Sequence, residues 1–455
     1  MGVQGGISAG AFVLAVSFLA FVAGALMAVA EMAPAGYVRD AYRAGLALVH
    51  KRELQATPYA TDLWQPARTE RRGLQLHDPE RSAPGLTLFT SGHAPAAYLI
   101  EPDGSVAHHW HAPYSRLHDE SAAVADPLPD RQVYFRRAHL YPNGDLLALY
   151  VGVGDSPWGY GLARLDRSSE VVWKNLDRFH HDLSVAEDGR IVTLTHAYRE
   201  DVPEGLDHLS RPVLDDYLTV VGPDGRTQHK FSLLETLERS AYRDLLWQTP
   251  TYTLADPLHT NAVDVLSQRD ASRLAQKIPA AAPGQVLVSF REVGGGLIAL
   301  VDPVEEELLW AQRGQWRSQH DPDVLPNGNL LLFDNLGDYG AAGRSRVVEI
   351  DPAHGGVVWA YGGSEDKPLE SVIRSAQQPL ANGNVLITES DGGRLLEITR
   401  EGERVWEYVN PVRGGEGDEF IPIVSWAQRV DPAQLDTAFR TALLHDHLAY
   451  QGGLP

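Results

Sequence analysis

Three histidines each stand at the start of a short apolar segment, and the three segments resemble one another. His181 begins HDLSVAEDGRIVTL, His259 begins HTNAVDVL, and His320 begins HDPDVLPNGNLLLF. An imidazole changes its protonation near neutral pH, so it can act as a nucleophile, as a general acid or base, or as a metal ligand. Three imidazoles at one place would suit either an anion or a zinc ion, and an arginine beside them would favour the anion.

The element that must position these histidines is a repeated β-hairpin. Asn327-Gly328 is a strong signal for a tight turn, and the apolar run 330–333 follows it. Eight residues separate the first position of this copy from its turn glycine, and the same spacing recurs along the chain. The pairs of first position and turn glycine are Arg136 with Gly144, His181 with Gly189, His320 with Gly328, and Ser375 with Gly383. The copy that begins at His259 carries the insertion SQRDASRLAQKIPAAAPG in place of its turn.

A second strand pair follows each hairpin and usually ends near a tryptophan, as in GLARLDRSSEVVW and SRVVEIDPAHGGVVW. Each unit therefore has four strands, and units recurring every forty to eighty residues or so are typical of a β-propeller. Counting from Leu86 gives six units, and FIPIVSWAQRV near the C-terminus should close the ring against the first. The first strand of each blade lines the channel, so the three histidines should converge at one mouth. Packing between blades explains the tryptophans at equivalent positions, which are Trp110, Trp173, Trp310, Trp359 and Trp406.

We therefore predict an all-β fold, a six-bladed β-propeller with an N-terminal transmembrane helix and short flanking helices. The predicted parts are a membrane anchor or signal segment (1–35), a helical or extended linker (36–85), the propeller (86–430) and a helical tail (431–455). The formal net charge of −21 argues against a nucleic-acid partner, because phosphates are neutralised by a basic surface. The chain has no cysteine, which excludes disulfides and cysteine-ligated metals.

Residues 7–30 carry no charge and are long enough to cross a hydrocarbon layer about 30 Å thick. Ala28-Val29-Ala30 resembles a signal peptidase site, but the apolar stretch exceeds the usual signal core, which favours an uncleaved anchor. Basic residues follow the segment and none precedes it, a distribution that favours a cytoplasmic propeller. A large translocated domain can override that bias, and our prediction is a membrane-anchored propeller on the periplasmic side. An amphipathic helix is expected over 36–56.

The segments around the three histidines resemble those of a known family, the bacterial arylsulfate sulfotransferases, which are six-bladed propellers. The similar segments are HDLSVAEDG, HTNAV followed by VLVSFR, and SQHDPDVLPNGNLLLFDNLGDYG followed by SRVVEID, in the order of the family. Together they cover roughly residues 86–410. The resemblance implies an enzyme that moves a sulfuryl group from an aryl sulfate ester to a phenolic acceptor.

The resemblance also implies a role for each site residue. His320 corresponds to the nucleophile of the family, which forms a sulfohistidine, and His259 and Arg291 correspond to residues that surround the moving group. His181 corresponds to the third active-site histidine, and its chemistry suits a general acid or base for the phenolic oxygen. Asp182 or Asp321 would orient these rings. Asn261, Ser375 and Gln378 are the candidate substrate-binding residues.

The expected partners are small molecules, an aryl sulfate donor and a phenolic acceptor, together with a membrane. No cofactor is expected, and no glycine-rich phosphate loop points to a nucleotide sulfate donor. Characterised members of the family have an N-terminal β-sandwich that helps them pair and a disulfide, and this chain shows neither pattern, so its oligomeric state stays open. The insertion between His259 and Arg291 is longer than expected, which leaves their mutual placement in question.

Two other interpretations remain open. The propeller could be a non-catalytic envelope protein that binds an anionic ligand or a partner protein at the same mouth. Alternatively, His181, His259 and His320 could hold zinc, although Arg291 beside them argues against a cation. Asp334, Asn335 and Asp338 have oxygens for a cation, but they also suit a turn that needs no metal.

Overall fold

The computed structural model describes residues 9–30, 57–338 and 344–449, together with scattered residues between 32 and 56. The chain forms two units, Met1–Ala60 and Thr61–Pro455. In the first unit, helix α1 (Ala9–Val29) is long and apolar enough to cross a membrane, and none of its residues is buried. It is therefore a candidate membrane anchor or signal sequence. Much of the amphipathic helix predicted for 36–56 lies outside the described residues.

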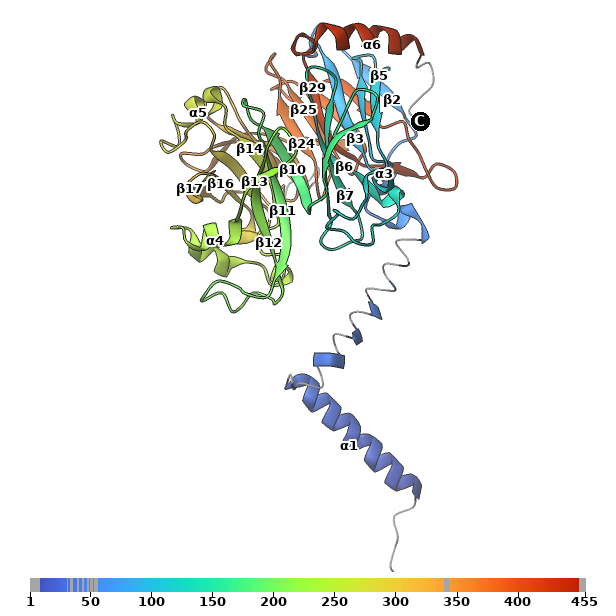
Figure 1. Ribbon diagram of the computed structural model, residues 1–455, viewed down its shortest axis with the longest axis vertical. Coiled ribbons are helices and arrows are strands. Elements are labelled where there is room, and N and C mark those ends of the chain that lie inside the picture. The colour runs from blue at the N-terminus through green and yellow to red at the C-terminus, as the bar shows by residue number, and fades with distance from the viewer. Residues whose placement is uncertain are drawn as a thin grey trace, which may run out of the picture. The chain divides into compact units, whose positions relative to one another are not determined.

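The second unit is a six-bladed β-propeller, as the sequence predicts (Figure 1). Each blade is an antiparallel sheet of at least four strands. From its innermost strand outwards, blade one comprises β29 (Val424–Val430), β3 (Leu86–Ser91), β4 (Ala96–Ile100) and β5 (Val106–His111). Blade two comprises β6 (Val133–Leu140), β7 (Leu146–Gly152), β8 (Gly159–Leu165) and β9 (Val171–Asn175). Blade three comprises β10 (Phe179–Val185), β11 (Ile191–Arg199), β12 (Val213–Val221) and β13 (Thr227–Ser232).

The remaining three blades follow in chain order. Blade four comprises β14 (Thr260–Val265), β15 (Val286–Phe290), β16 (Leu297–Asp302) and β17 (Glu307–Gln312). Blade five comprises β18 (His320–Val324), β19 (Leu330–Asp334), β20 (Arg346–Asp351) and β21 (Gly356–Tyr361). Blade six comprises β24 (Ala376–Pro379), β25 (Val385–Glu389), β26 (Arg394–Ile398) and β27 (Arg404–Val409). The innermost strands β29, β6, β10, β14, β18 and β24 each contact the next, so they form a closed ring around the channel.

The ring closes by pairing the two ends of the propeller. Strand β29, near the C-terminus, pairs with β3 and supplies the innermost strand of blade one, as predicted from FIPIVSWAQRV. The pairing leaves neither strand with an open edge. In the blade at the other side of the closure, β2 (Gly73–His77) adds a fifth strand to β27.

The structure differs from the predicted linker over 57–85. Besides β2, strand β1 (Trp64–Pro66) pairs with β28 (Phe420–Pro422), so much of this segment belongs to the propeller unit. Both strands are short and lie at sheet edges, so they lack the long alternating pattern from which sequence reasoning recognises strands. Two further short strands, β22 (Gly363–Ser364) and β23 (Lys367–Pro368), form their own hairpin.

Tryptophans on outer strands join neighbouring blades. Trp110 donates its indole N–H to the Gly144 carbonyl of blade two, and Trp406 donates to the Pro102 carbonyl of blade one. Both side chains are fully buried. Trp359 of blade five likewise donates to a turn carbonyl of blade six. A buried indole is stabilised when its N–H finds such a partner, and the ring supplies a large apolar area between blades.

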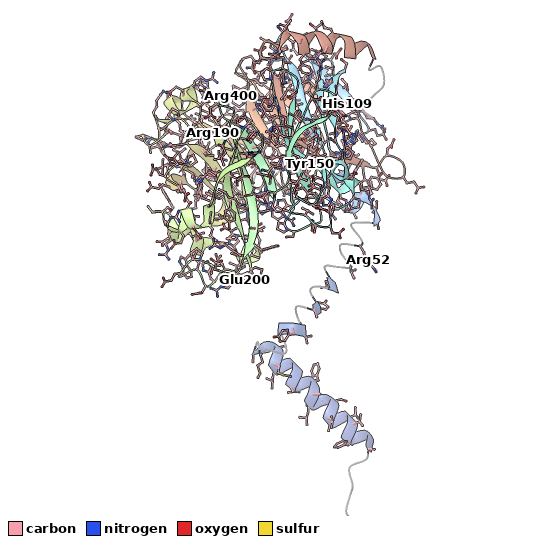
Figure 2. All side chains as sticks on the ribbon, in the orientation of Figure 1. Arg52, His109, Tyr150, Arg190, Glu200 and Arg400 are labelled. Atoms are coloured by element: carbon pink, nitrogen blue, oxygen red, sulfur yellow. The ribbon has the colours of Figure 1, made fainter. Side chains whose placement is uncertain are left out.

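Short helices cover the ends of the blades. Helix α4 (Leu233–Glu238) is capped by Ser232, whose hydroxyl accepts from the Glu235 N–H, and it packs on blade three. Figure 2 labels Glu200, which directly follows β11, and the neighbouring Arg199 pairs with Glu235 of α4. The other helices are α3 (Tyr114–Leu117), α5 (Gln268–Leu274), α6 (Thr437–Ala449) and the 3-10 helices η1 (Pro58–Ala60), η2 (Asp130–Gln132), η3 (Arg243–Gln248), η4 (Thr251–Thr253), η5 (Val293–Gly295) and η6 (Pro432–Gln434).

Candidate active site

The four residues that sequence reasoning selected as catalytic line one cavity of about 220 Å³. His181, His259 and His320 stand at or next to the starts of the inner strands β10, β14 and β18, and Arg291 follows β15. The cavity also contains residues that were not predicted, among them two further arginines and two aromatic side chains. They are Arg136, Arg374, Tyr134 and Trp158.

Irregularities in the inner strands aim these side chains. The register of β10 against β11 shifts between His180 and Leu183, and that of β18 against β19 shifts between His320 and Asp323. A bulge of this kind redirects the side chains of a strand end. His181 and His259 also have positive φ values, 57° and 44°. This conformation costs a residue other than glycine about 1–3 kcal/mol, and such strain concentrates at functional sites.

His320 is buried, and its surroundings determine which ring nitrogen carries the proton. Its Nδ1 lies 2.7 Å from Asn335 Oδ1 and 3.0 Å from the Ser318 carbonyl oxygen. The amide of Asn335 donates to the carbonyls of Ser371 and Arg374, which identifies the other amide atom as the acceptor oxygen. Both neighbours of Nδ1 therefore accept, so Nδ1 donates and the lone pair of neutral His320 lies on Nε2.

The protonation of His320 follows from the same environment. Burial lowers its pKa well below the usual value, and the positive charges of Arg136 and Arg291 lower the pKa further. The ring is therefore neutral at physiological pH, and Nε2 is available as a nucleophile.

His259 and Arg291 are held as a pair, despite the long insertion between them. The insertion, which contains α5, lies at the far end of the β14–β15 hairpin, while the near end brings the Arg291 N–H to the His259 carbonyl. Asp256 accepts from His259 Nδ1 at 2.5 Å, and Arg291 Nη1 donates to His259 Nε2 at 3.2 Å. Glu292 pairs with Arg291 Nε at 3.0 Å. Glu292 thus anchors the Nε side of the Arg291 guanidinium, while Nη1 lies beside the imidazole of His259 in the cavity.

His181 lies beside His259, with 5.0 Å between the ring centroids. Its Nδ1 is 2.7 Å from Nδ1 of His180, which is fully buried. Burial lowers the pKa of His181 well below its usual value, and the neighbouring His259, His180 and Arg136 act in the same direction. His181 is therefore neutral in this structure.

Arg136 is the main residue of the cavity that sequence reasoning passed over. It is only 6% exposed, and in the described part of the chain it forms no ion pair with a carboxylate. Its Nη1 donates to the backbone carbonyl and hydroxyl of Ser425 on the closing strand β29. A buried guanidinium without a counter-ion is costly, and an anionic ligand would offset that cost. The signal was present, because Arg136 occupies the repeat position that His181 and His320 occupy in their blades.

The other predicted residues lie outside the cavity mouth. Asn261 and Ser375 line the narrow channel behind His320, where Asn261 donates to the Gln319 carbonyl and Ser375 accepts from the Ser390 N–H. Gln378 joins β24 to the closing strand through two hydrogen bonds with the Arg429 backbone. In this structure, all three side chains therefore bond to the backbone of neighbouring segments and help to hold the inner strands together.

Asp182 and Asp321 do not orient the histidines. Both bind Arg137 in the channel, with contacts of 2.7 Å and 3.0 Å. Burial raises the pKa of Asp182 to about 6 and that of the nearby Asp264 to about 7. The channel is therefore a buried acidic cluster around one guanidinium.

Asp334 acts in a turn. Its Oδ1 accepts from the backbone N–H groups of Arg317 and Gly337, and its Oδ2 pairs with Arg346 at 2.9 Å. These donors occupy the carboxylate, so the geometry matches the turn interpretation of this segment.

Within the described residues, His180, His196 and Asp216 lie close enough together to hold a metal ion. Their hydrogen bonds argue against one. Burial lowers the pKa of His196 well below its usual value, so the ring is neutral and has one lone pair. That lone pair is on Nε2, which accepts from the Gly159 N–H at 3.1 Å. A metal would have to displace this backbone donor.

The model of a family described as arylsulfotransferase (ASST) matches residues 137–411, more than half of the 455-residue chain. No curated protein matches the chain. Solved structures similar to it include a Bacteroides caccae protein of unknown function (13% identity, TM-score 0.45, 75% of this chain and 99% of that chain), the Dos1 propeller (9%, 0.38, 80% and 83%) and streptogramin B lyase (9%, 0.39, 78% and 88%). At these levels of similarity the structures carry no argument about function.

Proposed function

The chain belongs to the arylsulfotransferase family, and we propose that it transfers a sulfuryl group from an aryl sulfate ester to a phenolic acceptor through a sulfohistidine at His320. The observation that carries this proposal is the tautomer of His320. Its Nδ1 proton is held by Asn335 and Ser318, so a lone pair remains on Nε2 in a cavity lined by guanidinium groups. A neutral nucleophile facing positive charge suits an attack on an anionic ester.

Transfer proceeds in two steps. In the first, His320 Nε2 forms a bond to sulfur while the bond from sulfur to the aryl oxygen breaks. The phenolate leaves with the electron pair and takes a proton from His181, which gains that proton from solvent as the anionic donor binds. In the second, the acceptor phenol gives its proton to His181 as its oxygen bonds to sulfur. The nitrogen–sulfur bond then breaks, and its electron pair returns to His320. No nucleotide sulfate donor is required.

Two arginines, one of them oriented by a histidine, stabilise the moving group. Sulfuryl transfer resembles phosphoryl transfer in that positioning and charge stabilisation dominate catalysis. Arg136 and Arg291 bring donors to the sulfuryl oxygens. His259 orients the second of these groups, because its Nε2 accepts from Arg291 Nη1 while its Nδ1 donates to Asp256. Removing one such donor typically lowers a rate by about 10²–10³-fold.

Aromatic side chains supply the complement for the aryl ring. Trp158 lies within 5.3 Å of the His259 ring centroid and within 5.7 Å of that of His181, and Tyr134 lines the same cavity. Offset stacking against such rings stabilises a bound phenol or aryl sulfate. A flat aromatic ester therefore suits the cavity better than an aliphatic one.

The test is mass spectrometry of the purified protein after brief exposure to p-nitrophenyl sulfate. We expect one added sulfuryl group on the peptide that contains His320, and its loss when phenol is added. His320→Ala should abolish both the adduct and the release of p-nitrophenol. Binding of the sulfate ester with neither adduct nor turnover would instead support the alternative, a non-catalytic propeller that recognises an anionic ligand.

We also propose that α1 is an uncleaved anchor and that the propeller lies on the periplasmic side of the membrane. The length and the apolar surface of α1 support the anchor. A protease added to intact cells with a permeabilised outer envelope tests the side, because only a periplasmic propeller would be digested.

A further inference from the structure

A line of two buried side chains, His180 and Asp216, runs away from the cavity behind His181. The His181 and His180 Nδ1 atoms are 2.7 Å apart, and His180 Nε2 lies 3.3 Å from Asp216 Oδ1. His180 is 0% exposed and Asp216 is 1% exposed. At the far end, Asp216 Oδ2 accepts from the Thr260 N–H at 2.6 Å, which ties the line to the strand that follows His259.

The contacts determine where the protons lie. Two ring nitrogens 2.7 Å apart must share one proton between them. Burial acts to raise the pKa of Asp216, but its contacts with His180 and Thr260 outweigh burial and keep that pKa below its usual value, so Asp216 is a carboxylate. A carboxylate beside His180 Nε2 favours a proton on that nitrogen. His180 Nδ1 then accepts from His181 Nδ1, and the lone pair of His181 lies on Nε2.

Alone, His181 would be a weak base for this reaction. Its pKa is held well below the usual value by burial first, and then by His259, His180, Arg136 and His320. A proton taken from an acceptor phenol would place a positive charge among these groups. The charge is better accommodated on His180, because the carboxylate of Asp216 is in contact with His180 and not with His181.

We propose that His180 and Asp216 are positioning residues that form a proton relay behind His181. When the acceptor phenol attacks, its proton moves to His181 Nε2 while the Nδ1 proton of His181 moves to His180 Nδ1, and the imidazolium of His180 rests against Asp216. Binding of the anionic donor brings this extra proton in from solvent, so the relay is charged before the first half-reaction begins. When a phenolate leaves the donor ester, it takes the Nε2 proton of His181, and the Nδ1 proton of His180 returns to His181. The inference deepens the proposed sulfotransfer and rests on it.

The groups that face the relay are consistent with this role. His196 stacks on His180 with 4.2 Å between ring centroids and an interplanar angle of 17°. Its own lone pair accepts from the Gly159 N–H, so it stays neutral and does not take the proton. Trp158 packs against His180, His181 and His196 with its ring nearly perpendicular to each of theirs.

The experiment measures the first half-reaction in the absence of acceptor, as the burst of phenol released from a series of aryl sulfates. His180→Asn keeps an acceptor near the position of Nδ1 but cannot take a proton, and Asp216→Asn removes the charge. Each variant should slow release from phenyl sulfate, whose leaving phenolate is strongly basic, by about 10²-fold. Release from p-nitrophenyl sulfate, a weakly basic leaving group, should change by less than about fivefold.

The control is His93→Asn, which alters a partly buried histidine that hydrogen-bonds Ser91 and Tyr98 in blade one. It should leave the dependence on the leaving group unchanged. If His180→Asn slowed all donors by one common factor, its role would be structural and the relay would be wrong.

A second measurement uses the unaltered protein and does not depend on whether the variants fold. The burst rate with phenyl sulfate is measured in mixtures of light and heavy water. Two protons in flight predict a curved dependence on the deuterium fraction, and a straight line would overturn the relay. No release from any donor by the unaltered protein would count against the proposed function itself, and not against the relay alone.

Discussion

At the scale of single residues, each reactive group of the cavity has a neighbour that determines its protonation or orientation. Asn335 holds the His320 Nδ1 proton, Asp256 holds that of His259, and Glu292 anchors Arg291. An imidazole can react through either nitrogen, so these contacts select the nitrogen that faces the substrate. Residues that never touch the substrate thereby control which atoms of the cavity can react.

Asn335→Ala should lower the rate of His320 sulfation by about 10- to 100-fold, because the ring loses the partner that orients it. It should also destabilise the fold by about 1–3 kcal/mol, since two buried carbonyls lose a donor. Asn410→Ala is the matched control. That asparagine is equally buried but bonds to Ser91 and Pro422, away from the cavity. Similar losses of activity per folded molecule in both variants would contradict the orienting role.

Arg136→Met should separate activity from stability. Removing a buried guanidinium with no carboxylate partner should leave the free energy of unfolding unchanged or raise it, while turnover falls about 10²–10³-fold. Arg429→Met is the contrast. Arg429 is equally buried but pairs with the fully buried Glu397, so its removal should cost about 3–5 kcal/mol. Urea denaturation and p-nitrophenol release measure the two quantities, and a strong loss of stability in Arg136→Met would refute the assignment.

At the scale of the elements, the six inner strands form two different environments. Their starts surround the cavity, which is rich in arginine and histidine, and their middles line a channel that is rich in carboxylates. Bulges at the starts of β10 and β18 separate the two by turning consecutive side chains to different sides. Arg137 from β6 holds the channel carboxylates Asp182 of β10 and Asp321 of β18, and Ser184 donates to Asp264 of β14.

The channel should make stability fall as pH rises. Burial raises the pKa of Asp264 on β14 to about 7, while an unfolded aspartate titrates near 3.8. Between these values the folded state binds more protons than the unfolded state, so this group's stabilisation is complete below about pH 4 and is lost as pH rises towards about 7.

Asp264→Asn tests this directly. The free energy of unfolding, measured by urea denaturation from pH 4 to pH 8, should fall less steeply in the variant, by up to about 1.4 kcal/mol per pH unit. The buried histidines, whose pKa values are lowered, act in the opposite direction but contribute equally to both proteins. Asp323 faces the same channel, and the charge of Asp264 is one cause of its raised pKa. Replacing Asp264 therefore lowers the pKa of Asp323 and flattens the pH dependence in the same direction. Parallel curves would rule out a titrating Asp264 in this pH range.

At the scale of the whole molecule, the ring of blades closes within a single unit of the chain. Thr61–Pro455 forms one compact unit, and the ring closes through β29 and β3 within it. Closure brings Ser425 of β29 to Arg136, so the pairing that completes the ring also orients a residue of the cavity. Helix α6 packs on β5 of blade one (Figure 1). Its Phe439 is buried and contacts Trp110.

Removing residues 1–56 should therefore leave a folded propeller with unchanged turnover. The truncated protein should move from the membrane fraction to the soluble fraction, because α1 is the apolar helix that it loses. Fractionation, thermal unfolding and p-nitrophenol release measure the three expectations. Loss of folding would show that the two units depend on each other.

Much of the fold followed from local signals. A hairpin is local in sequence, so its turn can be recognised from nearby residues alone. The turns need a positive φ, which Gly189 and Gly328 adopt, and the fixed distance of these glycines from the strand starts revealed the repeat. From that register the sequence predicted six blades, the closing strand and the joint position of His181, His259 and His320. It did not predict β1 and β2, whose short edge pairings carry little pattern.

The partners of the reactive residues were decided only by the tertiary structure. Asp216 reaches His180 from another strand of its blade, and Asn335 reaches His320 across a hairpin, so no spacing rule announces either contact. Arg136 has the same repeat position as the histidines, but only the structure shows that it is buried with no carboxylate partner among the described residues. Repetition in a sequence reveals which positions share a place, while protonation and charge balance depend on neighbours that only folding brings together.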